Sequence, residues 1–157
     1  MHNSLDVLSE SLDMKLQVLK EIEQYNEEQK KVFESEDPDM DAFDDALDKK
    51  EELISKIERL DDGFESMYAS LKDELNQNRD KYADRIKELQ GKIALVTELS
   101  MTVQASEARN KQLIEQYFSK KKLGIRQGRV GSKAAFDYYK NMSGMNVAEP
   151  NFMDSKK

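Results

Sequence analysis

The side chains of this chain that could do chemistry are almost all carboxylates, amines and amides. Its 157 residues include no cysteine, which excludes disulfides, thiolate zinc sites and cysteine nucleophiles, and only one histidine, His2. Asp41, Asp45 and Asp48 have a spacing that places three carboxylates on one side of a helix, where a metal ion could bind. Because no histidine and no Asp-x-Asp-x-Asp-Gly loop accompanies them, we interpret them as a solvated acidic face. No catalytic acid, base or nucleophile constellation can be named, so we expect no enzyme, no cofactor and no metal site.

A basic tail follows an acidic body. The net charge of the whole chain is -7, but residues 1–118 hold 16 Lys+Arg against 29 Asp+Glu, and residues 119–157 hold 9 against 3. The basic residues of the tail, together with aromatic residues such as Phe136, could contact phosphates and stack on bases. The strongly acidic body would repel a polyanion, however. We therefore expect no nucleic acid partner and favour a tail that folds back on the acidic helices or binds an acidic partner.

The elements that must position these side chains are predicted by a seven-residue repeat. In residues 4–34, apolar side chains follow one another at steps of three and four, which places them on one face of a helix. From Leu47 to Tyr117, one column of eleven positions recurs every seven residues, and nine of them are apolar or aromatic. A repeat of this kind is typical of long packed helices rather than strands. The column contains Leu47, Ile54, Asp61, Tyr68, Leu75, Tyr82, Leu89, Val96, Val103, Asn110 and Tyr117.

The breaks in this pattern predict an all-α fold, an elongated antiparallel three-helix bundle that resembles a coiled coil. Pro38 ends the first helix because proline disfavours helix in the residue before it, and Asp41 can cap the second. A turn at the polar residues 76–79 gives helices at about 4–34, 41–75 and 79–121 in a domain of residues 1–122. The competing break lies at residues 61–63. We prefer the first and interpret Gly63 as a bend.

The last part of the chain, residues 123–157, is predicted to be a flexible basic tail. It holds four of the six glycines and one short helix-competent stretch at about 132–142, with Phe136, Tyr139 and Met142 on one side. We expect it to be disordered or weakly docked when no partner is bound. The chain shows no signal peptide and no apolar run near the roughly 20 residues of a membrane helix, so we expect a cytoplasmic protein without membrane insertion. A homodimer, or a partner lying along the bundle, would supply burial that an elongated bundle lacks.

Asn110 is the one amide in the heptad column and has two interpretations. It could be a buried amide that fixes helix register at some cost in stability. Alternatively, this end of the last helix is not filled by its own bundle, and Asn110, Leu113, Ile114, Tyr117 and Phe118 face a ligand. Aromatic and methionine side chains in the tail suit adaptable binding of another helix. The residues alone leave the two interpretations open.

The sequence resembles the FlgN family of flagellar type III export chaperones. A Lys-x-x-Leu-Ile-like core is found at residues 49–57, and the third helix ends in the signature Glu-x-x-Asn-x-x-Leu-Ile at residues 107–114. A tyrosine-to-glycine element follows, from Tyr138-Tyr139 through Gly144. The resemblance implies a cytoplasmic chaperone that binds hook-filament junction (hook-associated) proteins, or a similar secreted helical client, and prevents their premature assembly.

The resemblance also implies a client-binding surface on the C-terminal helix and tail, here from Asn110 to Met142. The candidate binding residues are Asn110, Leu113, Ile114, Tyr117, Phe118, Phe136, Tyr138, Tyr139 and Met142. The export machinery is a further candidate partner. The alternative from another class of function is a structural coiled-coil scaffold, in which the heptad column mediates permanent self-association.

Overall fold

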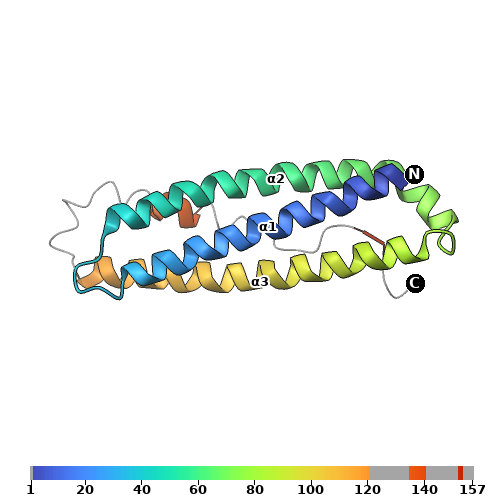
Figure 1. Ribbon diagram of the computed structural model, residues 1–157. Coiled ribbons are helices and arrows are strands. Elements are labelled where there is room, and N and C mark those ends of the chain that lie inside the picture. The colour runs from blue at the N-terminus through green and yellow to red at the C-terminus, as the bar shows by residue number, and fades with distance from the viewer. Residues whose placement is uncertain (1, 121–134, 141–151, 154–157) are drawn as a thin grey trace.

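The computed structural model describes residues 2–120, 135–140 and 152–153, and the described residues contain no strand. Three long helices, α1 (His2–Val32), α2 (Met40–Gln77) and α3 (Ala83–Lys120), run up, down and up beside one another (Figure 1). The prediction of an all-α helical bundle is therefore confirmed. The helices begin and end within four residues of the bounds expected from the sequence.

The turns between the helices lie where polar residues and proline interrupt the apolar repeat. The N-terminal cap of α2 is Asp39 and not the expected Asp41. The Asp39 carboxylate accepts a hydrogen bond from the backbone N–H of Ala42, with 3.1 Å between N and Oδ1. Asp41 instead lies in the first turn, where its charge favours the helix N-terminus. The second turn covers residues 78–82, and Gly63 lies inside α2. The competing break at residues 61–63 is therefore not present.

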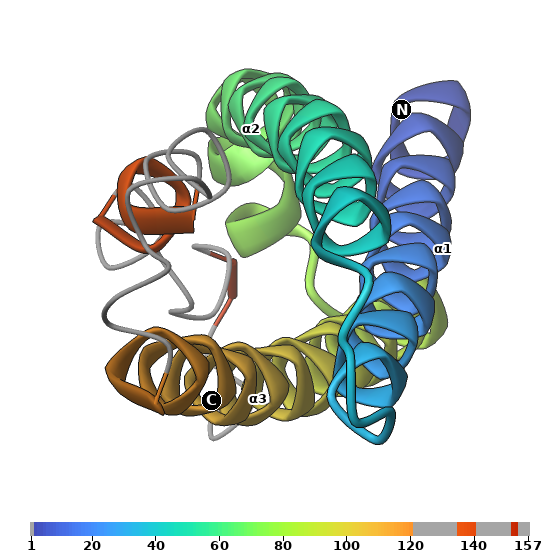
Figure 2. The same ribbon diagram turned by 90° about the vertical axis from the view of Figure 1, so that its left-hand side faces the viewer.

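Helix α1 lies between the other two. It packs along both α2 and α3, whereas no Cα atom of α2 lies within 8 Å of a Cα atom of α3. On end view the three helices form an open arrangement, and residues 135–140 lie on the side opposite α1 (Figure 2). The side chains of α2 and α3 on this open side are therefore available to the tail.

The core follows the heptad pattern along most of the bundle. The main cluster combines the leucines of α1 with the apolar columns of α2 and α3 from Ile57 to Val103. A smaller cluster at the other end joins Phe43, Leu47 and Ile114 to residues of the tail. At this end the apolar stripe of α1 gives way to Asn26 and Gln29, which are fully buried. The bundle therefore has a long apolar part and a shorter part with a polar centre.

Two short pieces of the tail pack on the bundle. Residues 135–140 are helical, within the stretch predicted to be helix-competent, and contribute Ala135, Tyr138 and Tyr139 to the smaller cluster. The ring of Phe152 lies 4.9 Å from that of Tyr68 and 6.1 Å from that of Phe64. The backbone oxygen of Met153 accepts a hydrogen bond from Gln90 at 3.1 Å. The predicted linker and Met142 lie outside the described residues.

Candidate functional site

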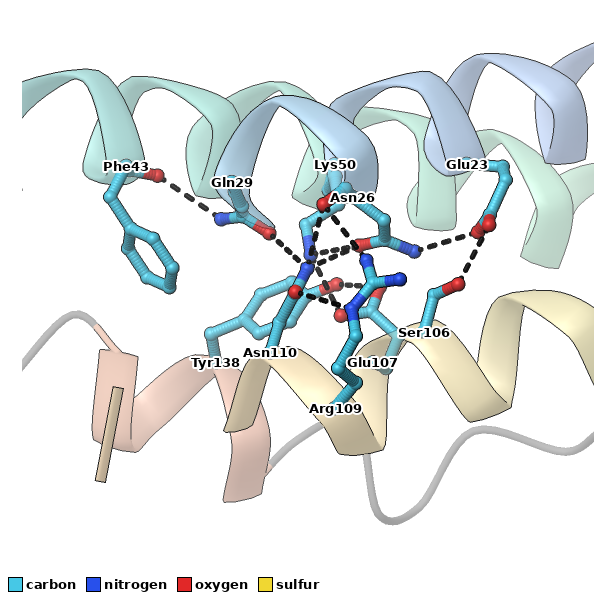
Figure 3. A network of polar contacts seen from close by, with 10 residues as sticks. All are labelled: Glu23, Asn26, Gln29, Phe43, Lys50, Ser106, Glu107, Arg109, Asn110 and Tyr138. Atoms are coloured by element: carbon cyan, nitrogen blue, oxygen red, sulfur yellow. Dashed lines mark hydrogen bonds and ion pairs between the residues drawn. The ribbon is translucent and has the colours of Figure 1, made fainter. Parts of the chain in front are cut away.

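A buried ion pair lies at the centre of the polar part of the bundle. Lys50 of α2 extends its amine to the carboxylate of Glu107 on α3, with 2.7 Å between Nζ and Oε1 (Figure 3). The Lys50 side chain is fully buried and that of Glu107 is 5% exposed. Because transfer of two charges out of water is costly, such a pair requires further hydrogen bonds from its surroundings.

Helix α1 supplies part of these hydrogen bonds through amide side chains. The Lys50 amine also donates to Asn26 Oδ1 at 2.7 Å. The Asn110 amide nitrogen donates to the backbone oxygen of Asn26 at 3.0 Å and to Gln29 Oε1 at 3.4 Å (Figure 3). Gln29 in turn donates to the backbone oxygen of Phe43 at 3.1 Å. These bonds join all three helices at one level and fix their relative register.

Tyr138 of the tail completes the cluster from the open side. Its hydroxyl donates to Glu107 Oε2 at 2.6 Å, and its ring centroid lies 4.4 Å from the Lys50 amine (Figure 3). A charge-assisted hydrogen bond and a cation–π contact are thus combined in one side chain, which is 2% exposed. The tail therefore covers both charges of the ion pair.

The electrostatics of the cluster reflect its burial. Burial lowers the pKa of the Lys50 amine from 10.5 to about 8, although the neighbouring Glu107 carboxylate acts in the opposite direction. Burial, and then the same carboxylate, raise the pKa of the Tyr138 hydroxyl well above its usual value. The hydroxyl is therefore protonated at neutral pH and can serve as a donor to Glu107.

An apolar pocket of about 520 Å³ lies between the end of α3 and residues 135–140. Ile114 and Phe118 line it from α3, Ala135, Phe136 and Tyr139 line it from the tail, and two lysines and a glutamate also line it. Phe136 is 68% exposed, the most exposed of the large apolar side chains in the described residues. An aromatic side chain in this position offers an apolar contact to a partner.

Comparison with known proteins places the chain in a family. The sequence profile of the FlgN protein family matches residues 1–122 of the 157. The chain belongs to the FlgN family. As a member it is a flagellar export chaperone, and the FlgN family is one of chaperones rather than enzymes. Neither a curated protein nor a solved structure shows significant similarity to the chain. None of the described helices of this FlgN chain is both long and apolar enough to cross a membrane.

The structure brings most of the residues expected to bind a client into one region. The buried ones are Ile114 of α3 and Tyr138 and Tyr139 of the tail, which belong to one apolar cluster. The half-buried ones are Leu113, Tyr117 and Phe118, and Phe136 is exposed. Asn110 is fully buried and its amide is bonded to α1, which agrees with its interpretation as a register-fixing amide. Whether these residues bind a client stays a prediction.

Sequence reasoning missed the charged and amide residues at the centre of this region. Lys50 stands three residues after Leu47, and Glu107 stands four after Val103, which are the core positions beside the heptad column. On α1, Asn26 continues the seven-residue spacing of the buried Leu5, Leu12 and Leu19, and Gln29 stands seven residues after the buried Ile22. Polar residues at core positions of a heptad repeat were the signal that could have found them.

Proposed function

We propose that this FlgN chain is a cytoplasmic chaperone that binds hook-filament junction (hook-associated) proteins and prevents their assembly before type III export. In this proposal residues 1–122 form the structural bundle, and residues 123–157 form a basic tail. The client, a helical segment of the exported protein, docks at the end of α3 and the adjoining tail. Family membership supports the chaperone function, and the apolar pocket at this end supports the location.

The pocket carries this proposal because it combines apolar lining with accessibility. Its walls come from residues that the sequence analysis selects independently, among them Ile114, Phe118 and Phe136. Helix-in-groove recognition uses apolar anchors of a partner helix in pockets of this kind. Lys111, Glu115 and Lys140 also line the pocket and supply charged groups for orientation. Burial of 1,000 to 3,000 Å², on the order expected for coupled folding and binding, gives a moderate net affinity that permits release.

The test is a calorimetric titration of the full chain with hook-associated proteins of the same cell. We expect binding of one of them, and a loss of about tenfold or more in affinity for Phe118→Ala, because truncation of an anchoring aromatic removes a large share of binding energy. Met101→Ala is the matched control, since Met101 is also a large apolar residue of α3, 64% exposed, and does not line the pocket. Absence of binding by the unaltered chain to every hook-associated protein would contradict the proposal.

A further inference from the structure

Residues 135–140 occupy the one side of the bundle that the long helices leave open. In end view α2, α1 and α3 form three sides of a four-sided figure, and residues 135–140 lie on the fourth (Figure 2). Since α2 and α3 do not approach each other within 8 Å between Cα atoms, a helix placed there contacts both. The tail thus completes a four-helix arrangement with a short segment.

The surface beneath this segment, here called the tail face, consists of Phe43, Leu47 and Lys50 of α2 and Glu107 and Ile114 of α3. The three apolar residues belong to one cluster with Ala135, Tyr138 and Tyr139. The two charged residues form the ion pair that Tyr138 covers. The tail face is therefore apolar, with one polar point at the end where Lys50 and Glu107 meet.

The ion pair makes the tail face selective for the side chain that covers it. Glu107 Oε1 accepts from Lys50, and Oε2 accepts from the Tyr138 hydroxyl. A helix with phenylalanine or leucine at this point would leave Oε2 buried without a donor, which is strongly unfavourable for a charged oxygen. Sites built to bond a hydroxyl discriminate against analogues that lack it. The tail face therefore favours a helix that carries a tyrosine.

The tail helix is a weak occupant of this face. An isolated helix needs more than about 12 residues to be stable in water, and the helix-competent stretch of the tail covers only about residues 132–142. The Tyr139 hydroxyl is buried and has no hydrogen-bond partner among the residues that the structure describes. Covalent attachment compensates, because a tethered segment acts at an effective concentration on the order of millimolar. A separate helix with better contacts can therefore take its place.

We infer that the tail face is a receptor for an amphipathic helix that carries a tyrosine, and that residues 135–140 occupy it until a client helix of this kind replaces them. The inference rests on the proposed function, because it names how the client is recognised: the client helix contacts the α3 wall of the pocket, Ile114 and Phe118, and takes the place of the tail wall. In this inference a tyrosine of the client takes the place of Tyr138, so that the client ring lies over Lys50 and the client hydroxyl donates to Glu107.

The experiment uses a fluorescent peptide that copies residues 132–142, added to the full chain. Tyr138→Ala in the chain weakens the tethered occupant, so we expect the peptide to bind this variant at least tenfold more tightly than it binds the unaltered chain. Tyr138→Phe in the peptide removes the donor to Glu107. We expect this altered peptide to bind the Tyr138→Ala chain about tenfold or more weakly than the unaltered peptide does. Tyr139→Phe in the peptide is the matched control and does not weaken binding, because that hydroxyl is buried and has no described partner to lose.

Two results would overturn the inference. One is that the peptide binds the unaltered chain and the Tyr138→Ala chain with equal affinity. The other is that the Tyr138→Phe peptide binds the Tyr138→Ala chain as tightly as the unaltered peptide does. Circular dichroism verifies that the altered chain is folded. If Tyr138→Ala is not folded, Tyr138→Phe in the chain replaces it, because this variant keeps the ring and loses only the hydroxyl.

A second arm connects the tail face to the client. A hook-associated protein that binds the full chain is titrated into the complex of Tyr138→Ala with the peptide, and we expect it to displace the peptide. A client that binds without displacement overturns the inference and leaves the proposed function intact. If no such protein binds at all, the proposed function fails, and the peptide titration alone decides whether the tail face selects tyrosine.

Discussion

At the scale of single residues, the buried pair of Lys50 and Glu107 is better explained by recognition than by stability. Desolvation of a buried ion pair often equals or exceeds the attraction between its charges, whereas removal of one partner costs about 3–5 kcal/mol. Here Asn26 and Tyr138 complete the hydrogen bonds, and one of these two comes from the tail. The pair is therefore fully satisfied only when a suitable side chain covers the open side.

The pKa of Lys50 reports whether the tail covers this pair in solution. Burial lowers this pKa to about 8. Because the folded value lies below the unfolded one, the buried ammonium opposes folding in full below about pH 8, and this contribution disappears as the pH rises toward 10.5. In a nuclear magnetic resonance titration of the Lys50 side chain we expect a midpoint near 8 for the unaltered chain, and a rise toward 10.5 for Tyr138→Ala, because removal of the ring admits water.

Tyr139→Phe is the control for that titration, since it keeps a ring in the neighbouring position and should leave the Lys50 midpoint near 8. A midpoint that does not move in Tyr138→Ala would mean that the bundle alone excludes water from the amine. The tail would then not be the element that buries the pair.

The sequence predicts these residues only in part. Asn110 was selected because an amide interrupts an otherwise apolar column, and the structure shows it bonded to α1. Lys50 and Glu107 stand beside the heptad column, three residues after Leu47 and four after Val103, but long charged side chains such as lysine at the edge of a heptad stripe usually reach solvent through their flexible stems. Their pairing depends on the three-dimensional approach of α2 and α3 to α1, which no local pattern encodes.

At the scale of elements, the helices were predictable because local and long-range signals agree. Pro38 and the polar turn at residues 78–82 interrupt an apolar repeat that continues on both sides. The docking of residues 135–140 was not predictable in the same way. Ala135, Tyr138 and Tyr139 become a packed face only against Leu47 and its neighbours, so the position depends on a complementary surface far away in the sequence.

Gly63 and Gly91 lie in the interiors of α2 and α3, and a methyl group added to either would meet nothing within 4 Å. We expect Gly63→Ala and Gly91→Ala each to raise the free energy of unfolding by about 0.5–1 kcal/mol, because alanine loses less backbone entropy in a helix. Urea unfolding followed by circular dichroism measures this. Stabilisation by Gly91→Ala but destabilisation by Gly63→Ala would indicate a bend or break at Gly63 that requires glycine.

At the scale of the whole molecule, the described part of the tail covers apolar surface of the bundle. In the bundle α1 lies between α2 and α3, and residues 135–140 of the tail lie on the side opposite α1 (Figure 2). A chaperone that keeps its own recognition surface covered exposes little apolar area while it has no client. A permanent scaffold, in contrast, would need an uncovered self-complementary face along the bundle.

Truncation after Lys120 distinguishes a chaperone that covers its own client surface from a permanent scaffold. Without the tail, the apolar residues Phe43, Leu47 and Ile114 lose their cover, as do Phe64 and Tyr68 where Phe152 packs. We expect the shortened chain to remain helical but to self-associate in a concentration-dependent manner, because uncovered apolar surface favours association. Sedimentation velocity over a range of concentrations measures this, and addition of a peptide that copies residues 132–153 should reverse it. The contrary result is that the full chain already forms the same stable oligomer and that the peptide does not change it. The bundle itself would then mediate self-association, which would favour the scaffold function over a chaperone that covers its own client site.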